Sequence, residues 1–363
     1  MTLHSLVGHH ETRRRLVEAT RKDRLPQVLV LAGPPGVGKQ RLALWLGQLV
    51  FCPVAGDDPC GSCRSCRMVA SLAHPDLHWF VPIARPKASE VDKQIEEASQ
   101  AITAVLDERR SQSLYGPVDG MASHGIASVR LLLRRASLTS VEGGPRVFII
   151  GEADRLVSQE SSPEAANALL KMLEEPPPGS LFVLTTVDAE RLLPTIRSRS
   201  VLLRVGGVGE VDVREFLATH LRPVPPASEL DRRVARAEGS IGRALSAGDE
   251  SGKAQRAASQ LLEAVLAGPG PSLEQALKQA PWSARGDFTA MLDALAEALS
   301  DAARESLGEK AHRPVPAGLK RYGPPDRLLK AMEHVAEARE AAWGNVNPQL
   351  LLAVLSEELA EVL

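Results

Sequence analysis

The chain has 363 residues, a formal net charge of -2, and a composition that is 44% hydrophobic and 24% charged. These values predict a globular protein of about two or three domains, and the lack of a basic excess argues against strong sequence-independent DNA binding by the chain alone. There is no apolar run of about 18 residues or more, and the first residues, Met1 to Arg15, are polar. We therefore expect neither a membrane span nor a secretory signal, and we place the protein in the cytoplasm.

A phosphate-binding loop with one unusual residue follows the first predicted strand, which covers 27–32. The loop reads Gly33-Pro34-Pro35-Gly36-Val37-Gly38-Lys39-Gln40. In this pattern, backbone N–H groups wrap a triphosphate and the lysine reaches its outer oxygens. The last position should carry the Ser or Thr hydroxyl that holds Mg²⁺. The amide of Gln40 is poorly placed for a small octahedral ion, so this half of the metal site is predicted to be lost.

The second half of the metal site is also incomplete. The apolar segment 147–150 predicts a strand buried on both faces. In nucleotide hydrolases such a strand ends in an Asp that supports Mg²⁺, followed by a Glu that polarises water. Here Gly151 stands at the Asp position and only Glu152 is retained. Because both metal contacts are missing, we predict that the chain does not hydrolyse ATP. Nucleotide binding without hydrolysis remains open, because the glycines and Lys39 are retained.

All four cysteines of the chain fall in one short segment. They are Cys52, Cys60, Cys63 and Cys66. This spacing lets four thiolates close on a tetrahedral Zn²⁺, and the prolines and glycines between them supply the turns. The alternatives are disulfides, which a cytosolic chain disfavours, and unconnected thiols, against which the clustering argues. We predict a structural zinc knuckle over 52–66, in which four thiolates leave no open position for catalysis.

The remaining elements predict a domain of alternating strands and helices, followed by helices alone. The alternation implies a parallel sheet with helices on both faces. In chain order, we expect a strand over 77–83, an insertion over about 85–125 with an apolar stripe toward the core, a helix over 126–136, a helix beginning at Ser162, and buried strands over 181–185 and 201–205.

Composition also suggests domain boundaries. We expect a nucleotide-binding domain over 1–206, a helical lid over 207–248, which follows a hinge at Gly206 and Gly207, and a helical domain over 252–363. Within the last domain, Gly and Pro predict loops at 268–271 and 313–325.

Several motifs together resemble the clamp-loader branch of the AAA+ proteins. They are the phosphate loop, the cysteine segment after its helix, NALLKMLEEPP at 167–177, SRS at 198–200 and NPQLL at 347–351. The resemblance covers nearly the whole chain. It implies an α/β AAA+ domain with a zinc knuckle, a helical lid and an all-α collar for oligomerisation. The implied complex belongs to the DNA polymerase III holoenzyme, contains the gamma and tau motor subunits and the delta subunit, and loads the sliding clamp onto primed DNA.

The resemblance also implies roles for single residues. Arg199 matches the arginine finger that the family's Ser-Arg-Cys motif supplies to ATP on a neighbouring subunit, although Ser200 replaces the Cys. Thr185 matches the position that senses the γ-phosphate. In the lid, Gly242 stands where the second sensor has its arginine, and Arg243 follows one residue later. These departures imply a stator-like subunit without hydrolysis. Without the resemblance, Arg199 would be interpreted as a solvated cation near a helix end.

Two other functions remain open. An ATP-hydrolysing motor subunit of the gamma or tau type is favoured by Lys39 and Glu152 and opposed by Gln40, Gly151 and Gly242. A zinc-dependent nucleic-acid-binding protein would contact its ligand through the knuckle, but only 3% of the residues are aromatic. Few side chains are therefore available to stack on bases.

Overall fold

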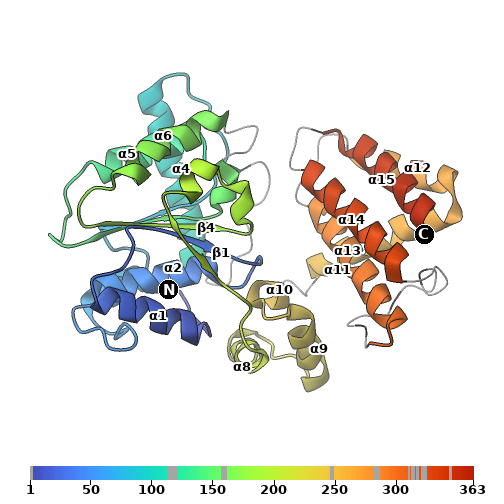
Figure 1. The fold of residues 1–363 in the computed structure, drawn as a ribbon, viewed down its shortest axis with the longest axis horizontal. Helices are drawn as coiled ribbons and strands as arrows, with labels where there is room; N and C mark the ends of the chain where they lie inside the picture. The colour runs from blue at the N-terminus through green and yellow to red at the C-terminus, as the bar shows by residue number, and fades with distance from the viewer. Residues whose placement is uncertain are drawn as a thin grey trace. The chain divides into compact units, whose positions relative to one another are not determined.

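The computed structural model describes residues 3–112, 122–156, 162–245, 249–280, 287–309, 311, 315, 319, 325–342 and 346–363. The chain forms two compact units, one over 1–245 and the other over 246–363 (Figure 1). Each unit has a hydrophobic core of its own. Among the described residues, no helix is both long and apolar enough to cross a bilayer.

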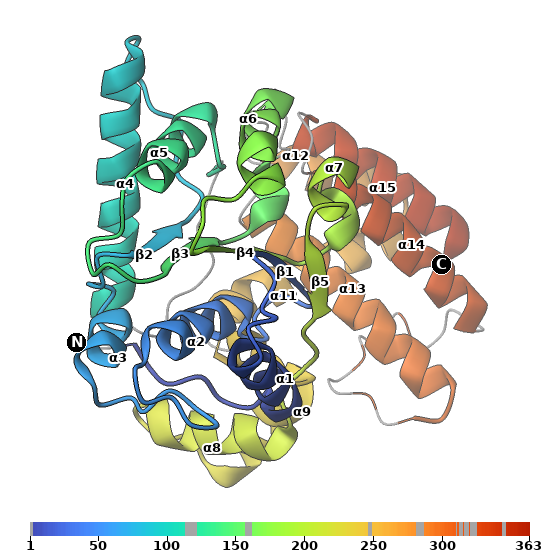
Figure 2. The same cartoon turned by 60° about the vertical axis from the view of Figure 1, so that its left-hand side comes forward.

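The first unit is built on a parallel sheet of five strands in the order β2-β3-β4-β1-β5 (Figure 2). The strands are β1 (Val28–Ala32), β2 (Leu77–Phe80), β3 (Arg146–Ile150), β4 (Ser180–Thr186) and β5 (Val201–Arg204). Every residue of β1, β3 and β4 is buried. Strands covered on both faces have continuous apolar sequences, and the predicted α/β fold with a parallel sheet is confirmed.

β5 departs from the prediction of a buried strand. It lies at the edge of the sheet, where Val201 is 50% exposed and Leu202 is 45% exposed. An apolar run of this length is compatible with either a central or an edge strand. The order of the strands, which is a tertiary property, decides between the two.

Helices cover both faces of the sheet, as predicted. Figures 1 and 2 show α1 (His10–Arg21) and α2 (Lys39–Phe51) on one face, with α4 (Val91–Ser111), α5 (Ile126–Ala136) and α6 (Ser162–Glu174) on the other. The predicted insertion contains α4, whose apolar stripe faces the core through Ile95, Ala98 and Ile102. Shorter elements are α3 (Arg64–Ala70), α7 (Pro194–Arg197), and the 3₁₀ turns η1 (Ala153–Leu156) and η2 (Ala189–Arg191).

Three short helices follow β5 within the first unit. They are α8 (Glu210–His220), α9 (Ala227–Ala237) and α10 (Ile241–Leu245). They pack around a small core of their own that includes Val213, Leu217 and Val234. We call α8, α9 and α10 the lid helices.

The second unit is entirely helical in its described residues. Its helices are α11 (Asp249–Ala267), α12 (Pro269–Lys278), α13 (Asp287–Ser306), α14 (Pro325–Ala341) and α15 (Pro348–Val362). The predicted loop at 268–271 is wrong, because residues 269–271 form the first turn of α12. Proline fits this position, where its missing N–H needs no partner. Most of the other predicted loop, 313–325, lies outside the described residues.

The carboxylate of Asp76 stabilises the loop that precedes β3 by accepting hydrogen bonds from it. Its buried carboxylate accepts hydrogen bonds from the Ser140 hydroxyl (3.0 Å) and from the amides of Val141 (2.8 Å) and Glu142 (2.9 Å). We predict that Asp76→Ala lowers the free energy of unfolding by about 1–3 kcal/mol, because these donors lose their acceptor. Urea unfolding measures the change. Asp92→Ala is the control, since its side chain is 85% exposed; equal effects of the two changes would contradict the prediction.

Candidate functional site

Lys39 turns back onto the phosphate loop. Its side chain is buried, and its Nζ donates hydrogen bonds to the carbonyl oxygens of Gly33 and Pro34, both at 2.7 Å. Burial lowers the pKa of Lys39 to about 8, an effect that the nearby carboxylates of Asp154 and Glu152 partly oppose. The ammonium group that would reach the outer phosphate oxygens is therefore engaged with the loop's own backbone.

The lid helices and the N-terminal segment close over the same loop. Ser240 Oγ donates to the carbonyl of Pro35 at 2.9 Å, and the Gly242 amide donates to the carbonyl of Gly36 at 3.0 Å. On the other side, His9 Nε2 donates to the carbonyl of Val37 at 2.7 Å. Together with Lys39, these donors satisfy the carbonyls of five consecutive residues, 33–37. The loop is thus held in place by protein groups.

The lid contact leaves no room for a sensor arginine at position 242. A Cβ on Gly242 would lie 2.7 Å from the Cα of Gly36, and a Cβ on Gly36 would lie 2.4 Å from Ser240 Oγ. The following residue, Arg243, points its guanidinium to Glu238, with an N···O distance of 2.8 Å. Backbone packing between loop and lid therefore requires glycine at 242, so no side chain extends from this position.

The two positions that should hold Mg²⁺ lie next to each other. A Cβ on Gly151 would lie 3.1 Å from Gln40 Nε2 and 3.2 Å from Gln40 Cδ. The Gln40 Oε1 accepts a hydrogen bond from Arg109 Nη1 at 2.9 Å. An amide capped by a guanidinium is not the set of oxygen ligands that Mg²⁺ needs, so these residues do not fit the metal of the fold family. Arg109 is not among the residues predicted from the sequence, because a cation in the last turn of a helix does not reveal a distant partner.

Glu152 and Thr185 are also engaged within the chain. The Glu152 amide donates to Thr185 Oγ1 at 3.1 Å, and its carboxylate pairs with Arg155 Nε at 3.0 Å. The backbone of Glu152 has a φ of 54°, in the left-handed region that a side chain makes unfavourable. The carboxylate of Glu152 is therefore paired with a cation, and the Thr185 hydroxyl accepts a backbone hydrogen bond.

Arg199 belongs to a different surface. It follows α7 and is exposed, with Nη1 donating to the Thr195 carbonyl at 2.8 Å and Nη2 lying 2.5 Å from Glu174 Oε1. Neither of these partners belongs to the phosphate loop. These contacts of Arg199 involve residues outside the predicted nucleotide site, and 33% of its side chain is exposed.

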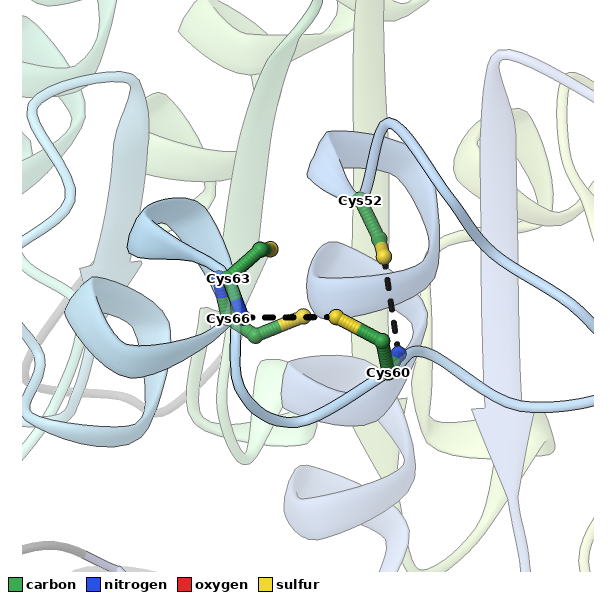
Figure 3. Close-up of side chains that lie close together, drawn as sticks. All are labelled: Cys52, Cys60, Cys63 and Cys66. Carbon is green, nitrogen blue, oxygen red and sulfur yellow. Dashed lines mark hydrogen bonds between the residues drawn. The ribbon is translucent and has the colours of Figure 1, made fainter.

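The four cysteines come together as predicted. Their Sγ atoms all lie within 4.8 Å of one another (Figure 3), and none forms a disulfide. Cys52 ends α2, Cys60 lies in the following loop, and Cys63 and Cys66 lie at the start of α3. A tetrahedral zinc ion with Zn–S bonds of about 2.3 Å holds its sulfurs about 3.8 Å apart, so the cluster is compatible with a structural metal.

Backbone amides donate hydrogen bonds to two of the cysteine sulfurs, which favours the thiolate form that binds a metal ion. The amide of Cys63 donates to Cys60 Sγ at 3.3 Å, and the amide of Cys66 donates to Cys63 Sγ at 3.4 Å. Hydrogen bonds from the amides of Cys63 and Ser62 lower the pKa of the Cys60 thiol to about 6. Burial raises the pKa of the Cys66 thiol, a cost that attraction between its thiolate and a bound cation would offset.

Two acidic residues of this knuckle contact side chains of α1 and α2. Asp58 accepts a hydrogen bond from Trp45 Nε1 at 3.0 Å and pairs with Arg13. Asp57 pairs with Arg21 at 3.0 Å. The knuckle is therefore attached to α1 and α2, the helices that flank the phosphate loop.

The fold and the site together define an α/β phosphate-loop protein whose loop is closed by its own side chains. Residues 8–208 match the protein-family model described as "DNA polymerase III, delta subunit". Because this match covers more than half of the chain, the chain belongs to that family. The predicted resemblance to a clamp-loader subunit is confirmed.

Individual relatives agree with this assignment. DNA polymerase III subunit delta' of Bacillus subtilis is 32% identical over 184 residues, 51% of this chain and 43% of the relative. The protein of the same name from Escherichia coli is 27% identical over 351 residues, 94% of this chain and 91% of the relative. The gamma/tau subunit of Mycobacterium tuberculosis is 30% identical over 198 residues, 54% of this chain and 27% of the relative. The chain spans about half the length of the first curated relatives it matches.

A solved structure of a gamma subunit-related protein from Thermotoga maritima aligns with 97% of this chain and 98% of its own. Its TM-score is 0.39 and its sequence identity is 18%. This likeness is too weak to add to the family assignment.

The cysteine cluster predicts a measurable metal content. Purified protein should hold one zinc ion per chain, and Cys60→Ser should release it and lower Tm by at least about 5 °C, because a closed tetrahedral site loses one thiolate. Elemental analysis and thermal melting measure these changes. Ser65→Ala on α3 is the control, since Ser65 offers no thiolate. Zinc content that is unaffected by Cys60→Ser would contradict the prediction.

The contact between the lid and the loop predicts a steric effect. Gly242→Ala should lower the free energy of unfolding by about 1–3 kcal/mol, because its Cβ would press on backbone that cannot rotate away. Gly206→Ala is the matched control, since a Cβ there meets no atom within 4 Å. Urea unfolding compares the two variants. A loss no larger for Gly242→Ala than for Gly206→Ala would show that the lid does not hold the loop.

Proposed function

We propose that the chain acts as a delta-prime subunit of a clamp loader, and that it does not hydrolyse ATP itself. The observation that carries this proposal is the pair of lost metal positions, where Gln40 lies against Gly151 and accepts a hydrogen bond from Arg109. Phosphoryl transfer depends mainly on positioning and on charge stabilisation by a metal. A site without metal ligands, whose Glu152 is paired with Arg155, supports a subunit that lacks this chemistry.

The contribution of the chain to hydrolysis would be made through Arg199. The guanidinium of an exposed residue suits an arginine finger, which stabilises the charge on a γ-phosphate held by a neighbouring subunit. The hydrogen bond to Thr195 and the ion pair with Glu174 support the side chain in one orientation. The neighbour would be a gamma or tau motor subunit, and the complex, with the delta subunit, would place a sliding clamp on primed DNA.

The second unit has an apolar surface that suits a collar. Leu273 and Leu277 on α12 are 53% and 62% exposed, and Leu350 and Val354 on α15 are 62% and 45% exposed. These two helices pack together, and Gln349 Nε2 donates to the carbonyl of Leu277 at 3.0 Å. Exposed apolar side chains on adjoining helices are typical of surfaces that bind other subunits, which supports an oligomerisation role for 252–363.

The two alternative functions have less support. A motor subunit would need oxygen ligands for Mg²⁺ at two positions that hold Gln40 and Gly151. A nucleic-acid contact through the knuckle would need a basic surface. The knuckle instead contributes Asp57 and Asp58 to ion pairs, and its Arg64 is paired with Glu142 at 2.8 Å.

The finger predicts a defect in the assembled loader. With Arg199→Ala, the ATP site that receives the finger should lose about 10³-fold in its rate of hydrolysis. The total ATPase rate of the complex should therefore fall by at least the fraction of the rate that this site contributes. The measurement is the ATPase stimulated by clamp and primed DNA, in a complex reconstituted with gamma or tau and delta.

Arg204→Ala is the matched control, because Arg204 is an exposed cation on the neighbouring β5. Unchanged turnover of the Arg199→Ala complex, with assembly intact, would contradict the finger. ATPase activity of the isolated chain that Lys39→Ala abolishes would contradict the absence of hydrolysis.

A further inference from the structure

The residues at the two lost metal positions depend on each other. Gln40 fills the space beside Gly151, so that a side chain at 151 would meet Gln40 Nε2, Gln40 Cδ and Trp79 Nε1 within 3.1–3.3 Å. An Asp at 151 could not be placed without moving Gln40. A small hydroxyl residue at 40 would leave this space unfilled. The two departures from the nucleotide-site pattern therefore form one packed arrangement.

A buried cation completes this arrangement. Arg109 lies in the last turn of α4, is 3% exposed, and donates to Gln40 Oε1 at 2.9 Å. Its guanidinium carbon lies 4.6 Å from the centroid of the Trp79 ring, a cation–π distance. Trp79 belongs to β2, beside the strand that ends at Ile150. The helix of the predicted insertion thus delivers a permanent positive charge to the positions where a metal ion would have its ligands.

The backbone around this charge is held on both sides. The Gly151 amide donates to the Phe80 carbonyl at 2.8 Å, and the Gly151 carbonyl accepts from His124 Nε2 at 2.6 Å. His124 is buried, and desolvation lowers its pKa to about 4, so the ring stays neutral near pH 7. A fixed backbone and a fixed guanidinium lie at the two lost metal positions, and the positive charge of Arg109 repels a divalent cation.

We propose that Arg109 is a built-in cation that takes the place of the divalent metal and locks the phosphate loop in one conformation. This inference rests on the proposed absence of hydrolysis and adds its structural cause. The lock makes the shape of the first unit independent of nucleotide and Mg²⁺. It also gives α4 a role, which is to reach the start of α2 through a contact that spans 69 residues of sequence.

Hydrogen exchange of the full-length chain tests the lock. Arg109→Met should speed exchange in peptides that cover 33–51 by at least about tenfold, because α2 loses the contact at its first turn. Arg110→Met is the matched control, since Arg110 neighbours Arg109, is 40% exposed, and pairs with Asp107. If Arg109→Met does not fold, Gln40→Met cuts the same contact from the other side and should give the same acceleration. Exchange as slow as in Arg110→Met would overturn the proposal.

A second experiment tests whether the Arg109 guanidinium takes the place of the metal ion. The double variant Gln40→Thr with Gly151→Asp restores both metal positions, and adding Arg109→Met removes the cation. The melting temperature is measured with ATP and Mg²⁺ and again with ATP and no added divalent cation, because a chelator would also remove zinc from the cysteine knuckle. We expect Mg²⁺ to raise Tm by several degrees only in the triple variant. Equal Mg²⁺ effects in the double and triple variants would overturn the proposal, whereas hydrolysis by the wild-type chain would overturn the proposed function.

Discussion

The closure of the phosphate loop by the protein's own donors is the constraint on which the rest of the site depends. Lys39, His9, Ser240 and the amide of Gly242 satisfy the loop carbonyls that lie between β1 and α2. In a nucleotide-driven protein, ligand and metal would share in organising such a loop. Here protein donors hold the loop through its carbonyl oxygens. The geometry of the loop is therefore set during folding, and the lid helices are attached to it through backbone packing.

The cations of the first unit fall into two groups. Those near the phosphate loop contact internal partners, whereas Arg199 is an exposed residue. The cations near the loop are turned inward: Lys39 toward carbonyls, Arg109 toward Gln40, and Arg155 toward Glu152. Arg199, by contrast, is an exposed residue that follows α7 and pairs with Glu174. A unit that does not change shape with nucleotide can present such a cation in a constant position. Constancy of this kind is what a finger acting on a neighbour requires, since its effect depends on placement.

The cysteine knuckle shares the same support. Its acidic residues pair with α1, and Asp58 also accepts a hydrogen bond from Trp45 on α2. Four sulfurs within 4.8 Å are held between the end of α2 and the start of α3. A metal bound there would support the C-terminal end of α2, the helix whose N-terminal end follows the phosphate loop. The contacts of Asp57 and Asp58 attach the knuckle to the helices α1 and α2.

Local patterns in the sequence determined most of the elements and the composition of the site. The buried strands, the helix over 126–136, the Gly-rich loop and the cysteine spacing are all encoded by residues close together in the chain. Tertiary structure alone decided that β5 is an exposed edge, because strand order is not a local property. It alone brought Arg109 to Gln40, because a contact across 69 residues depends on how α4 packs over the sheet. The sequence by itself showed that the metal ligands were missing, and only the fold showed that a guanidinium had been placed among the positions they left.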